Sequence, residues 1–540
     1  MPNAHTPGCD LSDKIPILAG ERAPSRPVTS LSKRYAVKLA ASIAAACAGV
    51  AVDSLGSRAL GPADYGQFYF LQQFFTQIFV LLGSSISLAV VVRSARRPLS
   101  RQFTFIYLVW LLAIPFFTQG FVEIAGLFGF ARYLWPGSAL LYVHLGALAS
   151  YLLFIGREGT ALGDAYGLTV RSEWARVVQR FLAFVLIVVL FVSHLLGLLN
   201  FFLYTCVVNA VLAVVLFGVL RSGNKLIFPR HPFRVRGLKA AAAYFYSYSS
   251  PLVIYVVISI AGVIFDRWLL QVAAGNIDQG FFSLAYQVSQ MMLLFVTAFV
   301  PLLMREMSIA HGAANYERLS SLFRRSLSNL YFVSGFFACF VAVFCDRFAL
   351  LVGGKLFAAS AFSIALVVLS AMHRTCGQVT AIVYYATGRT ALFRNIAIVT
   401  NLGGILLTYL LVANPRFGGL GMGANGLAIK TFLFEMFGVN TLAYFATRFL
   451  GIDYWRVAVQ QLICAASLLG VAGIVRFCLY SVAVPKDEPM ALFLYLGFAG
   501  ILYTALAIFL LYLFPDIAGL RRVELNKLQS LVLRVVRRDD

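Results

Sequence analysis

The sequence predicts an all-α polytopic membrane protein with about fourteen transmembrane helices. Of its 540 residues, 60% are hydrophobic and only 12% are charged, and the mean hydropathy is +0.83. Soluble globular chains have about 25% charged residues, so this composition excludes that class. The apolar residues also fall into successive stretches long enough to cross a bilayer core of about 30 Å. The connections between these stretches alternate in their Lys and Arg content, as in multi-pass membrane proteins.

Each span is placed where an apolar run reaches the length that a membrane helix needs. The division near residues 194–200 rests only on Gly197 and Asn200, which are the turn signals there. We expect spans at residues 36–57, 66–92, 103–126, 134–156, 178–196, 199–220, 241–265, 280–304, 328–350, 360–387, 393–413, 424–447, 457–481 and 490–514.

The segments outside the spans are polar or basic. Residues 1–34 have several prolines and no apolar run, and we expect a disordered cytoplasmic tail. Residues 221–240 are a basic linker, and residues 516–540 have the pattern of a basic amphipathic helix lying on the inner leaflet. With the N-terminus inside, most of the 44 Lys and Arg residues fall on the cytoplasmic side. The positive-inside rule therefore predicts that both termini are cytoplasmic.

The net charge of +22 is explained by this orientation. A cytoplasmic surface rich in Lys and Arg contacts anionic lipid headgroups. The bilayer is therefore the expected partner of these charges, and nucleic acid is not. No cofactor or metal motif occurs among the spans, and we expect neither.

The sequence contains an internal repeat, in which residues of the first half match residues of the second half at one constant shift in numbering. This shift brings the segment 60–68 onto 274–282, with Asp64 on Asp278, and it brings Gln73 onto Gln287. The offset predicts a parallel repeat of two six-helix lobes, the N-lobe in residues 35–220 and the C-lobe in residues 241–448. Residues 449–515 would then hold two additional helices. Repeats of this kind place a substrate site between the lobes, near the middle of the membrane.

Short motifs after the first and seventh spans carry a family resemblance. Residues 58–66 read RALGPADYG and resemble the "R-x-LGP-x-x-YG" segment of Wzx-type polysaccharide flippases. Asp266-Arg267 with residues 280–286 is similar to that family's D-R…G-x-Y-x-x-A segment, with Phe282 in place of the usual Tyr. Residues 418–428 resemble a G-x-x-GA turn. The resemblance covers roughly residues 30–515 and indicates the multidrug/oligosaccharidyl-lipid/polysaccharide (MOP) exporter superfamily.

The resemblance implies a V-shaped pair of lobes that alternate access across a bacterial inner (plasma) membrane. The implied cargo is a polyprenyl-(pyro)phosphate-linked oligosaccharide moved from the inner to the outer leaflet for cell-surface or exopolysaccharide biosynthesis. The implied partners are this lipid-linked oligosaccharide, the bilayer, and the polysaccharide polymerase with its chain-length machinery. Such a protein is a transporter and not an enzyme, and a gradient of H⁺ or Na⁺ would drive it.

Basic residues within or beside the spans are candidates for binding the anionic head group. Arg374 is the strongest, because it lies near the middle of a span, where an Arg costs about 2.5–3.5 kcal/mol to insert. It either faces the cavity and binds an anion or pairs with Glu435 inside a lobe. The other candidates can also be explained as interface or core residues; they are Lys38, Arg58, Arg267 and His144.

Acidic and amide side chains complete the predicted site. A desolvated carboxylate can carry a proton, so three acidic residues are candidates for ion or proton coupling, with ion pairing as the alternative: Asp53, Asp266 and Glu435. Four amides could line a polar cavity or form interhelical hydrogen bonds; they are Gln73, Gln77, Gln287 and Gln290.

Other functions stay open at this point. A multidrug or small-molecule exporter of the same superfamily would be expected to have an acidic cavity for cationic cargo, which Arg374 disfavours. A peptidoglycan-precursor flippase is a further alternative with poorer motif likeness. A membrane glycan polymerase or ligase is disfavoured, because such enzymes usually need a large outer loop and every expected outer connection is short.

Overall fold

The computed structural model describes residues 31–96, 101–222, 235–482 and 488–519, and it is built from helices joined by short turns. No strand occurs within these ranges. Ten helices in the described part have the length and apolar composition needed to cross a membrane. The chain is therefore a multi-pass membrane protein, and the total of about fourteen spans stays a prediction.

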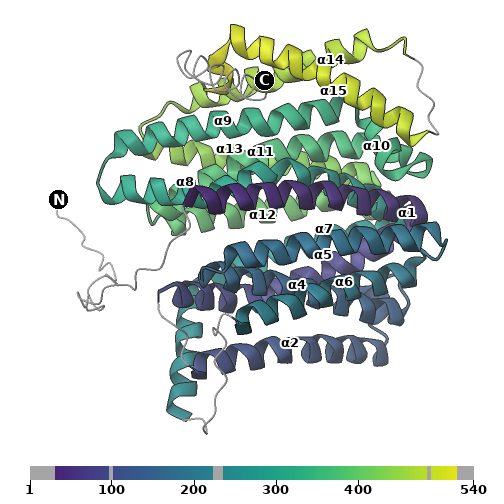
Figure 1. The fold of residues 1–540 in the computed structure, drawn as a ribbon, viewed down its shortest axis with the longest axis vertical. Helices are drawn as coiled ribbons and strands as arrows, with labels where there is room; N and C mark the ends of the chain where they lie inside the picture. The colour runs from purple at the N-terminus through teal and green to yellow at the C-terminus, as the bar shows by residue number, and fades with distance from the viewer. Residues whose placement is uncertain (1–30, 97–100, 223–234, 483–487, 520–540) are drawn as a thin grey trace.

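The N-terminal half forms one end of the molecule. Figure 1 shows α2, α4, α5 and α6 running side by side at one end of the long axis. The Gly197 region separates two helices, as the sequence predicts. The elements are α1 (Leu31–Arg96), α2 (Arg101–Leu127), α3 (Ala131–Leu134), α4 (Leu140–Ala165), α5 (Thr169–Val192) and α6 (Leu198–Ser222).

The C-terminal half forms the other end, where α9, α11, α13, α14 and α15 lie roughly parallel (Figure 1). The expected span 328–350 ends earlier, because the chain turns at Phe344 and starts the separate short helix α10. The elements are α7 (Val235–Gln290), η1 (Met291–Leu293), α8 (Leu294–Gly312), α9 (Tyr316–Val343), α10 (Cys345–Gly353), η2 (Lys355–Ser360), α11 (Ala361–Ala386), α12 (Thr390–Val412), η3 (Pro415–Phe417), α13 (Gly423–Phe449), α14 (Tyr454–Cys478), α15 (Pro489–Leu513) and η4 (Pro515–Ala518).

Two long elements, α1 and α7, each contain a sharp kink at a glycine. Gly61 in α1 has φ 69° and ψ 174°, and Gly275 in α7 has φ 79° and ψ −168°. Only glycine adopts such positive φ values without strain. The two arms of α1 correspond to two expected spans, whereas the expected span 280–304 is divided among the second arm of α7, η1 and α8. The two glycines are related by the same offset that brings Asp64 onto Asp278.

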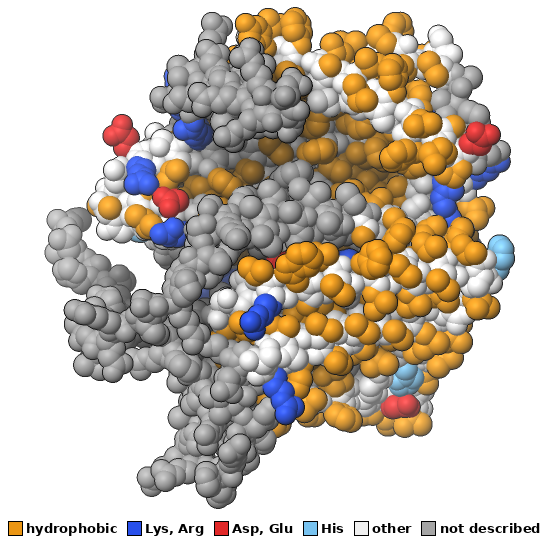
Figure 2. Space-filling view, viewed as in Figure 1, with side chains coloured by type: hydrophobic (Ala, Val, Ile, Leu, Met, Phe, Trp, Pro, Cys, Tyr) orange, Lys and Arg blue, Asp and Glu red, His pale blue; other side chains and the backbone are white. Residues whose placement is uncertain are grey.

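The surface is that of a protein in lipid. In Figure 2, apolar side chains cover most of the described surface, and the few charged ones lie mainly toward the ends of the helices. Large apolar side chains such as Phe116, Leu127, Phe181 and Phe477 are strongly exposed. Helices satisfy their backbone hydrogen bonds internally, which allows these faces to contact hydrocarbon.

Several expected features lie outside the described residues. They are the tail up to residue 30, most of the linker at 221–240, and residues 520–540 of the basic C-terminal segment. The side chain of Lys38 is also outside the described part of the chain. These expectations stay predictions.

Candidate functional site

A cavity of about 1250 Å³ lies between the two halves of the molecule. Its walls come from α1, α4, α5 and α6 on one side and from α7, η1, α9, α10 and α15 on the other. Small-molecule pockets usually measure about 300–1,000 Å³, so this cavity can hold a larger ligand. Its position between the halves is the one that internal repeats predict for a transporter.

The wall formed by the N-terminal half is polar. The only charged side chains along the described lining are Asp53, Arg157 and Arg180, which together give a net charge of +1. The uncharged polar side chains of this wall are Tyr69, Gln72, Gln73, Thr76, Gln77, Gln179, Tyr204, Thr205 and Asn209. Such a wall can donate several hydrogen bonds to an anionic and hydroxyl-rich ligand.

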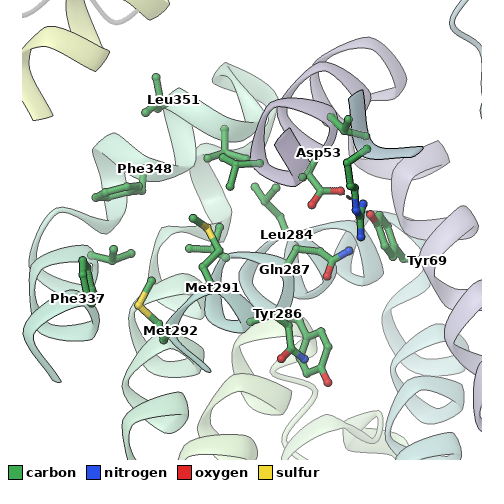
Figure 3. Close-up of a pocket in the computed structure, with 18 of the residues that line it drawn as sticks. Asp53, Tyr69, Leu284, Tyr286, Gln287, Met291, Met292, Phe337, Phe348 and Leu351 are labelled. Atoms are coloured by element: carbon green, nitrogen blue, oxygen red, sulfur yellow. Dashed lines mark hydrogen bonds between the residues drawn. The ribbon is translucent and has the colours of Figure 1, made fainter. Parts of the chain in front are cut away.

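Asp53 lies on this wall with its carboxylate held by one neighbour. The Tyr69 hydroxyl donates a hydrogen bond of 2.7 Å to Asp53 Oδ1. Asp53 and Tyr69 come from the two arms of α1, which the kink at Gly61 brings together. Figure 3 shows both side chains beside Gln287 of α7. No group of three or more His, Cys, Asp and Glu side chains is placed to hold a metal ion within the described ranges.

Arg157 and Arg180 are functional candidates that the sequence reasoning missed. Neither forms an ion pair with a residue of the described part, and both side chains are exposed at the cavity. Glu158, next to Arg157, instead accepts a hydrogen bond of 2.9 Å from the Tyr107 hydroxyl. Two cavity arginines that form no close ion pair in the described part of the chain can bind an anionic ligand directly.

The reason for the omission is the length of the helices. The expected spans place Arg157 and Arg180 in or beside a cytoplasmic connection. In the structure α4 continues to Ala165 and α5 begins at Thr169. Arg157 therefore lies about two turns inside α4, and Arg180 about three turns inside α5. The sequence does contain one signal for a polar site in this helix, namely the polar pair Gln179-Arg180 near the start of an apolar run.

The opposite wall of the cavity is mainly apolar, and its polar side chains are Tyr286, Gln287 and Gln290 of α7 and Tyr503 and Thr504 of α15. Met291 and Met292 of η1 face it, together with Phe337 of α9 and Phe348 and Leu351 of α10 (Figure 3). Helix α15 adds further apolar side chains, among them Ile501 and Ile508. Methionine side chains are flexible and adapt to irregular apolar ligands. The charged side chains and most of the polar ones are thus on the wall from the N-terminal half, and the wall from the C-terminal half is mainly apolar.

Arg374 is held inside the C-terminal half. Its Nε atom donates a hydrogen bond of 2.9 Å to Glu435 Oε1, which joins α11 to α13. The guanidinium also lies 5.8 Å from the ring centroid of Tyr286, a residue that does line the cavity. Arg374 and Glu435 are not among the lining residues. The structure therefore contains the ion pair of the second interpretation, and anion binding by Arg374 stays a prediction.

Asp266 and Arg267 are both held by neighbours within the C-terminal half. Lys430 Nζ lies 2.5 Å from Asp266 Oδ2, and the Thr408 hydroxyl donates to Oδ1 at 2.6 Å. Arg267 donates to Gln279 Oε1 at 3.2 Å and to the Ser283 hydroxyl oxygen at 3.0 Å. Neither residue lines the cavity.

Arg58 and His144 lie elsewhere. Arg58 donates to the carbonyl oxygens of Leu350 and Leu351 at the end of α10, at 2.9 and 2.7 Å. His144 is hydrogen-bonded to Gln119 at 2.6 Å and lies 3.2 Å from Glu123. The cavity thus brings together five of the predicted residues, namely Asp53, Gln73, Gln77, Gln287 and Gln290. The functional roles assigned to all of these residues stay predictions.

Comparison with solved structures assigns the fold. The structure is similar to the lipid II flippase MurJ in an inward closed conformation, with a TM-score of 0.60 and 12% identity over 87% of this chain and 98% of MurJ. It is also similar to an inward-facing multidrug resistance MATE transporter of the MOP superfamily, with a TM-score of 0.56 and 14% identity over 77% of this chain and 98% of that one.

A third similar structure is a MOP superfamily transporter from Pyrococcus furiosus, described as having a binding pocket of reversed polarity. Its TM-score is 0.53, and the two chains are 13% identical over 78% of this chain and 95% of the other. No protein-family model matches the chain, and no curated protein matches it in sequence. The chain therefore has the fold of the MOP superfamily flippases and exporters, and these neighbours are transporters rather than enzymes.

Proposed function

We propose that this chain is a secondary active flippase that moves a polyprenyl-(pyro)phosphate-linked oligosaccharide from the inner to the outer leaflet. The fold shared with flippases and exporters of the MOP superfamily supports transport by alternating access. The cargo class rests on one observation. The cavity places Arg157, Arg180 and a set of amide groups opposite a mainly apolar wall, and a lipid-linked glycan has matching anionic, polar and apolar parts.

The polar wall suits the head group. A guanidinium donates two parallel hydrogen bonds to phosphate oxygens, and it keeps its charge at any pH that the protein meets. Arg157 and Arg180 come from neighbouring helices and face the same cavity. Gln73, Gln77 and Asn209 on the same wall can donate to and accept from sugar hydroxyls.

The apolar wall suits the start of the lipid chain. This wall contains Phe337, Phe348 and Met292, whose side chains form no strong hydrogen bonds. A diphosphate bound at the arginines would therefore have its glycan on the polar side and its prenyl chain against this wall. The cavity volume of about 1250 Å³ accommodates the head group, and the rest of the lipid would stay in the bilayer.

Asp53 is the candidate for coupling transport to an ion gradient. It is the only acidic residue along the described cavity lining, and its carboxylate receives a hydrogen bond from Tyr69. A carboxylate that lines the cavity can bind H⁺ or Na⁺ when the cavity is open to one side and release it on the other. The driving ion would come from the gradient across the bacterial inner membrane, with both termini of the chain cytoplasmic.

A second candidate function is transport of a peptidoglycan precursor, because the lipid II flippase MurJ has the same fold. A multidrug exporter is less well supported. A cavity for cationic drugs would need negative charge, whereas the described lining has a net charge of +1. Partnership with a polysaccharide polymerase and its chain-length machinery follows from the proposed pathway.

The test is flipping in proteoliposomes that contain the purified full-length protein. Replacing both cavity arginines (Arg157→Gln with Arg180→Gln) should slow flipping of a polyprenyl-diphosphate oligosaccharide at least about tenfold, since each charged hydrogen bond contributes about 1.5–3 kcal/mol. Arg171→Gln, also on α5 but outside the cavity lining, is the matched control. Wild-type flipping by the double variant would contradict the proposal, as would equal flipping of the same glycan on an uncharged lipid.

A further inference from the structure

We propose that the kinked segments around Gly61 and Gly275 form a two-fold latch that closes the cavity at one end, and that Arg58 locks this latch. The proposal depends on alternating access and not on the nature of the cargo. The latch consists of contacts between the two halves on the side of the cavity where α1 and α7 are kinked. Asp53 and Phe68 are the cavity-lining residues of α1 nearest to this side. This end is called the kink end below.

The first observation is a reciprocal backbone contact between the halves. A Cβ atom on Gly66 would lie 1.9 Å from the carbonyl oxygen of Asn276, and a Cβ atom on Gly280 would lie 2.1 Å from the carbonyl oxygen of Pro62. The repeat offset takes Gly66 to Gly280 and Pro62 to Asn276. The same contact is therefore made twice, in the manner of an interface with two-fold symmetry.

Side-chain hydrogen bonds across the halves follow the same symmetry. Ser57 of α1 donates to the carbonyl oxygen of Val352 at 2.9 Å, and Gln271 of α7 donates to that of Pro136 at 3.1 Å. The offset takes Ser57 to Gln271. In both cases the acceptor is a carbonyl at or just after the end of a short helix in the other half, α10 or α3.

Aromatic side chains fill the space between these contacts and the cavity. Tyr65 of α1 and Phe357 of η2 are both fully buried, with ring centroids 5.6 Å apart. Phe281 of α7 lies 6.0 Å from the same Phe357 ring. None of the three lines the cavity. They therefore separate the cavity from the kinks.

Arg58 is the part of the latch that breaks the symmetry. It donates to the last carbonyl oxygens of α10, where a cation is favoured by the unpaired carbonyls and the helix dipole. Its equivalent in the other half is Val272, an exposed residue. Since α10 also contributes Phe348 and Leu351 to the cavity wall, separation of the halves at this end must break the Arg58 contact.

Helix α10 is also tied at its other end. Arg476 of α14 donates to Asp346 Oδ1 at 3.1 Å, in the first turn of α10. The short helix is thus bound by an arginine from the N-terminal half at its end and by an arginine from α14 at its start. Opening of the latch would then be transmitted to α14 and to α15, which packs on α14.

The experiment measures the distance across the kink end in the full-length protein. Spin labels at Ala63→Cys and Ile277→Cys report on it, because both positions are exposed and equivalent in the repeat. The background has the reactive native cysteines replaced by serine. Gly66→Ala and Gly280→Ala should each raise the long-distance population by about tenfold, since the added carbon can be accommodated only when the halves separate.

Gly403→Ala is the matched control, because a Cβ atom there meets nothing within 4 Å, and it should leave the distances unchanged. Unchanged distances in both Gly66→Ala and Gly280→Ala would overturn the proposal. An effect of one glycine without the other would overturn the reciprocity. These outcomes are independent of flipping, so they are distinct from failure of the proposed function.

A second variant removes contacts without adding bulk, and it decides the question if the glycine variants do not fold. Arg58→Met deletes both hydrogen bonds to α10 and should also increase the long-distance population. Arg416→Met, at an exposed arginine in η3, is its control. Wild-type distances in Arg58→Met would show that Arg58 does not lock the latch.

Discussion

The two halves of the molecule place opposite charges at equivalent positions of the repeat. In the N-terminal half, Tyr69 donates to the carboxylate of Asp53 at 2.7 Å. The repeat offset takes these positions to Ser283 and Arg267, and there the guanidinium of Arg267 donates to the Ser283 hydroxyl at 3.0 Å. The same two positions are thus joined with the polarity of the hydrogen bond reversed.

The surroundings of the two charges also differ. Asp53 lines the cavity, whereas Arg267 is 5% exposed and lies against the ring of Phe282. In the C-terminal half Arg374 and Lys430 each form an ion pair with a carboxylate, while Arg157 and Arg180 of the N-terminal half form no close ion pair within the described ranges. A buried charge is costly unless it is paired. The comparison predicts that the ion-paired Arg374 and Lys430 stabilise the C-terminal half, whereas Arg157 and Arg180 of the N-terminal half are available to a ligand.

The largest expected effect on stability comes from breaking a pair in the C-terminal half. Arg374→Ala leaves the largely buried Glu435 without its partner, and we expect a loss of up to about 3–5 kcal/mol in the free energy of unfolding. Adding Glu435→Gln should restore part of it. Unfolding in detergent micelles, with membrane abundance, is the measurement. If the variant were normally stable but lost transport, Arg374 would be an anion-binding residue. That result would contradict the structural role inferred for it from the comparison of the two halves.

A smaller effect is expected from the equivalent hydrogen bonds. Ser283→Ala leaves Arg267 with one fewer acceptor and should cost about 1.5–3 kcal/mol, because the donor is charged and buried. Tyr69→Phe removes a hydrogen bond to a carboxylate that water in the cavity can replace, so it should cost less. Both variants would be compared by unfolding in the same detergent. Equal losses would mean that Asp53 is as enclosed as Arg267.

The smallest effect on stability is expected for Asp53→Asn, below about 1 kcal/mol, because the amide oxygen can still accept from Tyr69. Its effect on transport should be large, with flipping in proteoliposomes no longer depending on an imposed H⁺ or Na⁺ gradient. Asp266→Asn, measured alongside, should keep the gradient dependence and lose stability instead. Gradient-dependent flipping by Asp53→Asn would remove this residue from the coupling step.

The fold was largely predictable because each span carries its own apolar signal. The repeated segments at residues 60–68 and 274–282 were predicted as connections between spans, and the kinks within them were not predicted. The site was harder. Periodicity does not tell whether an arginine near a helix end faces lipid headgroups or a cavity, so Arg157 and Arg180 were assigned to a connection. The position of Arg374 near the middle of its span was compatible with two interpretations. It could face the cavity, or it could pair with Glu435, which is 61 residues further along the chain.

The reciprocal contact of Gly66 and Gly280 has an evolutionary consequence. Each half presents one glycine and one carbonyl to the other, in the same relative arrangement. A chain of half this length, with a single kink, could therefore meet a second copy of itself through the identical contact. An ancestor of half this length would then have been a homodimer. The opposite charges at Asp53 and Arg267 would have arisen after fusion of the two copies, when each was free to diverge.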